Sequence, residues 1–151
     1  MLLIKNKKAR FDYQILDTFD AGMVLLGNEV KSLKRKTANI NSSYIVIKKS
    51  PDSGKIEAFL VGAIIPPYQP QNISSNYNPE GERKLLLNKK EILHLLGKLK
   101  IKGITLVPLE IYTIRGLIKL KFAIAKGKKK HDKREDIKRR DRERETKTGI
   151  F

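Results

Sequence analysis

The sequence contains no cysteine, only two histidines and no long apolar run. The absence of cysteine excludes disulfide scaffolds, cysteine-ligated zinc, iron–sulfur clusters and thiol catalysis. No apolar stretch approaches the roughly 20 residues that span a bilayer. The opening apolar run is also too short for a signal peptide, because Lys5, Lys7 and Lys8 end it. We therefore expect a cytoplasmic protein with no membrane partner.

Acidic residues are few as well: 16 Asp and Glu stand against 33 Lys and Arg in 151 residues, which gives a formal net charge of +17 at pH 7. This length fits one domain with an ordinary core. A hydrophobic content of 40% excludes a wholly disordered chain. The charge implies an acidic partner and disfavours self-association, so we expect a monomer.

The last part of the chain differs from the rest in composition. Residues 126–151 contain 12 Lys and Arg against 6 Asp and Glu, and only Ile137, Ile150 and Phe151 are strongly apolar. Such a segment cannot offset the entropy of ordering it. We therefore expect a folded domain over residues 1–127 and a basic tail over residues 128–151 that is disordered when free. Three acid-before-base pairs at i,i+4 favour a helix once a polyanion binds: Glu135 with Arg139, Asp136 with Arg140, and Glu143 with Lys147. A solvated charge run without a specific role is the alternative.

Apolar patterning in the first 125 residues is mainly of the strand type. Turn residues at 51–54 and at 115–116 predict two hairpins. Asn28 is expected to cap one helix over residues 29–35, and Asn88 a second over residues 89–99. The predicted strands cover residues 11–16, 23–26, 44–47, 56–65, 105–113 and 117–125. This predicts a mainly β protein with short helices, folded as a closed oligonucleotide-binding-like β-barrel.

Groups that carry catalysis are scarce. His94 falls within a predicted helix and His131 lies in the tail without a second ligand. No phosphate loop, dinucleotide fingerprint or nucleophile elbow is present. We therefore expect no enzymatic activity, no cofactor and no metal, and a hydrolase or nuclease remains only if the fold assembles a site that the sequence does not reveal. Dispersed cations, among them Lys34, Arg35, Lys36 and Arg83, together with Phe11, Tyr13, Tyr44 and Tyr68 as stacking candidates, instead indicate nucleic-acid binding.

A series of short strings, in a fixed order, is far more specific than the charge. They are Asn6-Lys7-Lys8-Ala9-Arg10, Ala21-Gly22-Met23-Val24-Leu25, Gly27-Asn28-Glu29-Val30-Lys31-Ser32-Leu33, Ala38-Asn39-Ile40, Ser43-Tyr44, Arg83-Lys84-Leu85-Leu86-Leu87-Asn88, Gly103-Ile104-Thr105-Leu106-Val107-Pro108-Leu109, Ala125-Lys126-Gly127-Lys128-Lys129 and Asp132-Lys133-Arg134. Over about residues 5–140 this series resembles the small protein B family, the SsrA-binding proteins of bacterial trans-translation.

The resemblance implies a barrel that binds the tRNA-like domain of transfer-messenger RNA and enters stalled ribosomes with it. It also implies a tail that lies as a helix in the empty messenger channel, and elongation factor Tu with GTP as the carrier of the charged RNA. The stalled peptide is then tagged and the ribosome released. A general single-strand RNA-binding or ribosome-associated barrel protein is the alternative.

The family's functional positions are carried over residue by residue. The implied RNA-binding residues are Asn6, Lys7, Lys8, Arg10, Asp20, Glu29, Lys31, Lys84, Leu86 and Asn88, and the implied ribosome decoding-centre residues of the tail are Lys128, Lys129, His131, Asp132, Lys133 and Arg134. Asp20 is expected either to accept from a ribose hydroxyl or to hold a neighbouring cation. The chain departs from the family at Phe11 and Ile64, where His is frequent, at Asn28, where Thr is usual, and at Ser42, which replaces an acid. The apolar end, Ile150 and Phe151, is expected to anchor in the channel.

Overall fold

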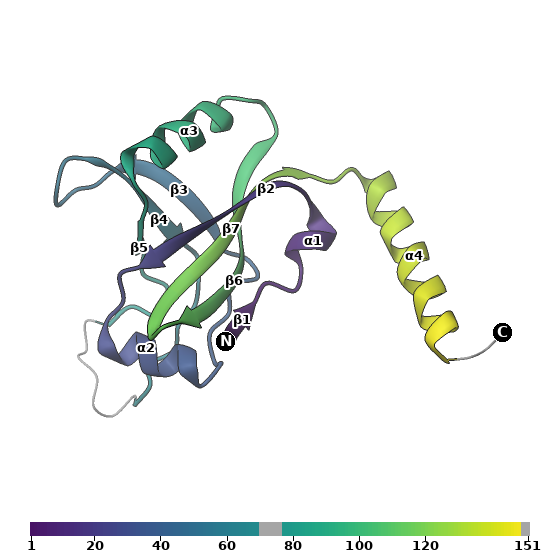
Figure 1. Ribbon diagram of the computed structural model, residues 1–151, viewed down its shortest axis with the longest axis horizontal. Helices are drawn as coiled ribbons and strands as arrows, with labels where there is room; N and C mark the ends of the chain where they lie inside the picture. The colour runs from purple at the N-terminus through teal and green to yellow at the C-terminus, as the bar shows by residue number, and fades with distance from the viewer. Residues whose placement is uncertain (70–76, 149–151) are drawn as a thin grey trace.

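The computed structural model describes residues 1–69 and 77–148 and contains a seven-stranded antiparallel sheet with the strand order β1-β6-β7-β2-β5-β4-β3 (Figure 1). Four helices accompany the sheet in these residues, and the last of them projects from the body (Figure 1). The strands are β1 (Leu2–Lys5), β2 (Tyr13–Met23), β3 (Tyr44–Lys49), β4 (Ile56–Val61), β5 (Arg83–Leu86), β6 (Ile104–Ile114) and β7 (Leu117–Gly127), and the helices are α1 (Ala9–Asp12), α2 (Gly27–Lys34), α3 (Lys89–Leu99) and α4 (Lys130–Thr148).

Both predicted hairpins are confirmed. β3 pairs with β4, and β6 pairs with β7 across a two-residue turn at Arg115 and Gly116. These residues have φ values of 52° and 78°, the positive angles that a tight hairpin turn of this kind needs. In β7, Ile118, Leu120 and Phe122 are buried, as the alternation in the sequence predicts. Local turn chemistry therefore fixes the β3–β4 and β6–β7 pairings of the sheet.

The predicted closed barrel is wrong, because the sheet is open. In the described residues the edge strands β1 and β3 pair with one neighbour each, and β3 lies near β6 across the core without a ladder between them. β1 has only four residues, and α2 packs beside it. Beyond the end of β1, the N–H of Lys7 donates to Asn41 Oδ1 at 3.1 Å, and no ladder joins β1 to β3 in the described residues. The coarser prediction, mainly β with short helices, is confirmed.

The start of β2 also differs from the predicted strand over residues 11–16. Asn6 Oδ1 accepts from the N–H groups of Lys8 and Ala9, at 3.2 and 3.1 Å. This side chain turns the backbone into α1, so the strand begins only at Tyr13.

The cap predicted at Asn28, for the helix over residues 29–35, is wrong by two residues. α2 begins at Gly27 with Leu26 at the N-cap position. The Leu26 N–H donates to Glu29 Oε1 at 2.9 Å, so a side chain from inside the helix stabilises its first turn. The predicted strand over residues 23–26 ends at Met23 for the same reason. In contrast, α3 spans Lys89–Leu99 with Asn88 as its cap, as predicted.

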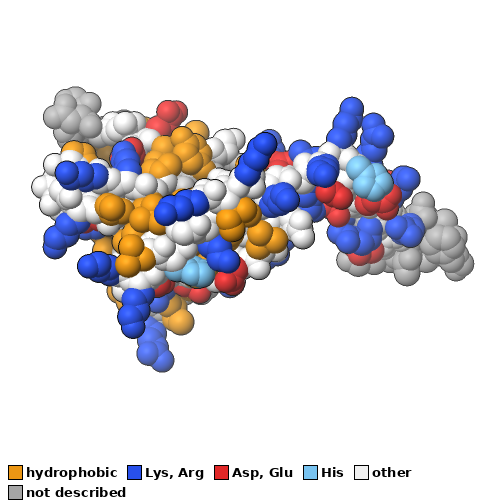
Figure 2. Space-filling model, turned by 90° about the horizontal axis from the view of Figure 1, so that it is seen from above, with side chains coloured by type: hydrophobic (Ala, Val, Ile, Leu, Met, Phe, Trp, Pro, Cys, Tyr) orange, Lys and Arg blue, Asp and Glu red, His pale blue; other side chains and the backbone are white. Residues whose placement is uncertain are grey.

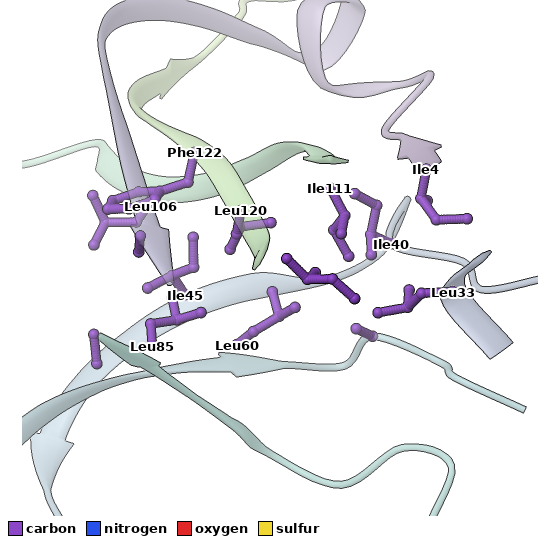
Figure 3. Packing of buried hydrophobic residues seen from close by; sticks show 14 of the residues in the cluster. Ile4, Leu33, Ile40, Ile45, Leu60, Leu85, Leu106, Ile111, Leu120 and Phe122 are labelled. Atoms are coloured by element: carbon purple, nitrogen blue, oxygen red, sulfur yellow. The ribbon is translucent and has the colours of Figure 1, made fainter. Parts of the chain in front are cut away.

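The main core lies on the concave face of the sheet. Side chains of β6 and β7 meet those of β3, β4, β5 and α2 there, as Figure 3 shows for Leu106, Ile111, Leu120, Phe122, Ile45, Leu60, Leu85 and Leu33. A second, small cluster lies on the other face of the sheet, where Ala9 of α1 covers Val107, Leu109, Ala123 and Ala125. α1 is therefore fixed on the outside of the sheet, next to the point where β7 leads into α4.

Candidate nucleic-acid interface

Cations cover this molecule widely rather than in one compact patch. Figure 2 shows Lys and Arg side chains over the visible face of the body and along the projecting helix. The predicted site residues lie in five places: the β1–α1 corner, β2, α2, the segment from β5 into α3, and α4.

The β1–α1 corner combines three exposed cations with one buried amide. Lys7, Lys8 and Arg10 are exposed, whereas Asn6 is 6% exposed. Asn6 Nδ2 donates to the Pro108 carbonyl at 2.8 Å, and Asn6 Oδ1 accepts the two hydrogen bonds that start α1. Asn6 therefore builds the corner, and the three cations are exposed around it.

Two cations, one in α2 and one at its C-cap, lie over one aromatic ring. The Arg35 guanidinium carbon is 4.2 Å from the centroid of the Tyr68 ring, and Lys31 Nζ is 5.5 Å from it. Arg35 Nη2 also donates to the Tyr68 hydroxyl at 3.3 Å. From the sequence, Tyr68 is only a stacking candidate. Nothing in its local pattern indicates that it contacts Arg35, which lies 33 residues earlier in the chain. Lys31 and Arg35 are exposed and share this anchor.

Glu29, although predicted at the interface, lies inside the protein. It is 5% exposed and Arg83, the first residue of β5, is 3% exposed. Arg83 Nε donates to Glu29 Oε2 at 2.7 Å. Burial and the nearby Glu29 carboxylate raise the pKa of Tyr77, whose hydroxyl donates to the Ile65 carbonyl at 2.7 Å. The structure therefore places Glu29 and Arg83 beneath the surface that Lys31 and Lys84 present.

The segment from β5 into α3 carries a cation, an exposed leucine and a cap. Lys84 Nζ lies 3.2 Å from Glu57 Oε1. Burial acts to raise the pKa of Glu57, but hydrogen bonds from Lys84 and Ser53 outweigh it, so the pKa is lowered. Leu86 is 54% exposed and packs on Gly22, where an added Cβ would be 3.3 Å from the leucine Cδ1. A groove of about 640 Å³ beside it is lined by Ile56, Leu86, Leu87, Ile92, Leu93 and Lys89, among others.

Asn88 caps α3, so its predicted contact with RNA would be a second role of the same side chain. Its Oδ1 accepts from the Glu91 N–H at 2.8 Å, and its own N–H donates to Glu91 Oε1 at 3.3 Å. We expect Asn88→Ala to lower the free energy of unfolding by about 1 kcal/mol through loss of this cap. Asn88→Ser keeps a capping oxygen and is the matched control. If the Asn88 amide contacts RNA, both variants bind RNA more weakly, while only the alanine variant has a lower melting temperature. If both variants keep the full RNA affinity, Asn88 is not part of the interface.

Asp20 is exposed on β2 and already has a partner within the sheet. The Tyr112 hydroxyl donates to Asp20 Oδ1 at 2.7 Å, and Lys121 of β7 is the residue opposite Asp20 in the ladder. Burial and the hydrogen bond to Asp20 raise the pKa of Tyr112 to about 12. The phenol therefore stays protonated and donating at physiological pH. Asp20 therefore accepts a hydrogen bond from a hydroxyl within the sheet, and its predicted contact with a ribose hydroxyl or a cation stays a prediction.

The tail residues form a helix docked on α1, and the disorder expected of the free tail is not seen. Lys128 pairs with Asp136, and its Nζ also donates to the Arg10 carbonyl at 2.8 Å. Lys133 Nζ lies 3.3 Å from Asp12 Oδ1. Lys133 and Arg140 lie over the Phe11 ring, at 5.7 and 5.1 Å from its centroid. Phe11, one of the departures from the family, is therefore a packing group for the tail. The other tail positions are exposed: Lys129, His131, Asp132 and Arg134. The predicted anchor at Ile150 and Phe151 lies outside the described residues.

Docking of α4 is expected to depend on pH. The hydrogen bond from Lys128 holds the pKa of Asp136 below its ordinary value of 3.8. Because the pKa of the Asp136 carboxyl is lowered, docking favours its ionised form. The contribution of the Lys128–Asp136 pair to docking is therefore present above the ordinary pKa and is lost as the pH falls through the lowered pKa.

Because the chain has no cysteine, single cysteines introduced at Gln14 and Lys138 can carry spin labels. The distance between them is expected to stay constant from pH 7 to 5 and to lengthen below pH 4. Asp136→Asn should lengthen it at pH 7; an unchanged distance in that variant would contradict the role of the pair.

Among residues 1–69 and 77–148, no three His, Asp or Glu side chains are grouped so as to hold a metal ion. None of the helices in this part of the chain is both long enough and apolar enough to cross a membrane.

These features define a class: a small, mainly β protein with an open antiparallel sheet, widely spread cations and a basic helix that projects from the body. The SmpB protein family matches residues 3–150. The SsrA-binding protein of Neorickettsia sennetsu is 50% identical over 137 residues, which cover 90% of this chain and 88% of that protein. The SsrA-binding protein of Thermosipho africanus is 48% identical over 141 residues, which cover 93% of this chain and 90% of that protein. A solved chain from a structure described as "tmRNA-SmpB: a journey to the center of the bacterial ribosome" is 39% identical, with a TM-score of 0.66, and the match covers 88% of this chain and 92% of that chain. The chain belongs to the SmpB protein family.

Proposed function

We propose that this chain binds the tRNA-like domain of transfer-messenger RNA and brings it to stalled ribosomes for trans-translation, in which the stalled peptide is tagged and the ribosome released. The observation that carries the proposal is the match of the SmpB protein family to residues 3–150. The solved relative that is 39% identical is described with tmRNA and the bacterial ribosome together, which supports both partners. A cytoplasmic location follows from the ribosome as partner.

The body and the tail have separate tasks in this proposal. Residues 1–127 bind the RNA through the exposed cations of the β1–α1 corner and α2 and through the segment from Lys84 to Asn88. The tail from Lys128 onward occupies the empty messenger channel as a helix. Two features support this: α4 is continuous over Lys130–Thr148, and His131 and Arg134 in its first half, together with Lys129 just before it, are exposed. The protein acts by positioning, without a covalent step or a cofactor.

Two further partners belong to the same proposal. Elongation factor Tu with GTP delivers the charged RNA, and the protein travels with it as a monomer. The net charge of +17 supports the monomer, because like copies repel each other at low salt.

Neutralising Lys31 is expected to reduce the salt dependence of RNA binding. Lys31 is exposed on α2, and each lysine that contacts a phosphate releases about one counterion. For Lys31→Gln we expect the slope of log Kd against log salt to fall by about one unit. Lys49→Gln, an exposed lysine of β3 outside the proposed surface, is the control and should keep the slope. Equal slopes in the two variants would remove Lys31 from the phosphate contacts.

The function is tested by a reconstituted tagging reaction. Ribosomes stalled on a messenger without a stop codon are supplied with charged transfer-messenger RNA, elongation factor Tu and GTP, with and without this protein. We expect tagged peptide only when the protein is present. If the protein binds RNA of any kind yet supports no tagging, the general RNA-binding alternative is favoured.

A further inference from the structure

Arg83 and Glu29 form a buried ion pair that joins two separate parts of the proposed RNA-binding surface. The two side chains are 3% and 7% exposed, and Nε of Arg83 lies 2.7 Å from Oε2 of Glu29. Glu29 belongs to α2, which carries Lys31 and is followed by Arg35 at its C-cap. Arg83 is the first residue of β5, which carries Lys84 and Leu86 and leads directly to Asn88.

The Arg83 guanidinium makes further bonds that fix where β5 begins. Its Nη1 donates to the carbonyls of Ala63, at 2.9 Å, and Gly81, at 2.6 Å. Ala63 follows β4, and Gly81 lies just before β5. One planar group therefore ties α2, the end of β4 and the entry to β5 together in fixed directions.

Stability alone does not explain this pair. Taking two charges out of water carries a large desolvation penalty, and apolar residues of similar size often serve a fold as well or better. The pair is also incompletely satisfied, because Arg83 Nη2 is buried and has no hydrogen-bond partner among residues 1–69 and 77–148. A buried donor left unpaired is itself destabilising. Directional bonds, in contrast, are what an apolar replacement cannot supply.

We propose that Arg83 and Glu29 are positioning residues for RNA recognition: they hold α2 against β5 so that the cations of α2 and the segment from Lys84 to Asn88 meet one RNA at the same time. This inference rests on the proposed binding of the tRNA-like domain. Neither side chain touches the RNA, because both are buried beneath the surface. Loss of the pair therefore affects binding to a folded RNA, which requires fixed spacing, more than binding to an unstructured RNA, which requires charge alone.

The test compares two RNAs and three variants. The RNAs are the tRNA-like domain of transfer-messenger RNA and an unstructured RNA of equal length. The double variant Glu29→Met/Arg83→Met removes both charges at once and avoids an unpaired buried ion. Arg83→Lys keeps the ion pair but cannot reproduce the planar fork. Lys31→Gln is the matched control, because it removes a surface cation and leaves the pair intact.

For the double variant we expect at least a tenfold loss of affinity for the tRNA-like domain, unchanged affinity for the unstructured RNA and an unchanged salt slope. Arg83→Lys is expected to lose less affinity for the tRNA-like domain and likewise to keep its affinity for the unstructured RNA. If the double variant does not fold, the result for Arg83→Lys tests the inference. Lys31→Gln should instead weaken binding to both RNAs and lower the slope.

Two results would overturn the inference. If the variants fold and keep the full preference for the tRNA-like domain, the pair does not position the surface. If their salt slope falls by about one unit, Arg83 contacts a phosphate directly. The proposed function fails separately, when the unchanged protein itself shows no preference between the two RNAs.

Discussion

A chain that ends after Gly127 is expected to bind the tRNA-like domain with nearly full affinity and to support no peptide tagging on stalled ribosomes. The physical basis is the separation of α4 from the core. Neither hydrophobic cluster of the described residues includes a residue beyond Ala125, and α4 is held to the body through α1, by ion pairs and by cations over Phe11. Removing it leaves the sheet and its proposed RNA contacts in place.

This prediction is checked with the reconstituted tagging reaction and a binding measurement on the same two proteins. A thermal melt of the shortened chain provides the control for folding. A full-length chain with Lys133→Ala and Arg134→Ala separates loss of particular side chains from loss of the helix. Tagging by the shortened protein at the full-length rate would show that the tail has no part in rescue.

Phe122→Ala is expected to lower the free energy of unfolding by about 3–5 kcal/mol. Phe122 is 0% exposed, lies in the centre of β7 and packs on Phe19 with ring centroids 5.7 Å apart. The truncation leaves a cavity in the main core and removes this ring contact. A loss of this size is a large fraction of the 5–15 kcal/mol that stabilises a typical domain.

The measurement is urea unfolding, with Leu117→Ala as the control. Leu117 lies at the start of the same strand and is 61% exposed, so its truncation should change stability by less than about 0.5 kcal/mol. RNA affinity of the Phe122 variant, measured where the protein is folded, should stay close to that of the unchanged chain. Similar stability losses in the two variants would contradict the burial pattern of β7.

Some of the fold was predictable because it depends on neighbours in sequence. The turn at Arg115 and Gly116 sets the β6–β7 hairpin, and Asn88 and Glu91 sit three residues apart, so the cap of α3 follows from local pattern. The cap of α2 was missed because its acceptor, Glu29, lies inside the helix rather than before it.

Long-range features were beyond the sequence pattern. Closure of a barrel depends on whether β1 and β3 meet, and alternation within each strand contains no information on that. Glu29 and Arg83 are 54 residues apart, and both are charged residue types that are expected at the surface. The resemblance to the family named Glu29, yet only the structure shows that this carboxylate faces Arg83 inside the protein. Likewise, the charge pattern of the tail predicts helix, but the docking of Lys133 and Arg140 on Phe11 depends on how the chain folds back on itself.

The most direct test of the central claim is the affinity of this protein for the tRNA-like domain of transfer-messenger RNA, measured across a salt series against an unstructured RNA of equal length. Charge contacts weaken for both RNAs as salt rises, whereas recognition of shape applies to the folded RNA alone. The account predicts a preference for the tRNA-like domain that persists as salt rises. Equal affinities that fall together with salt would contradict it, and would leave a basic protein that binds RNA through charge alone.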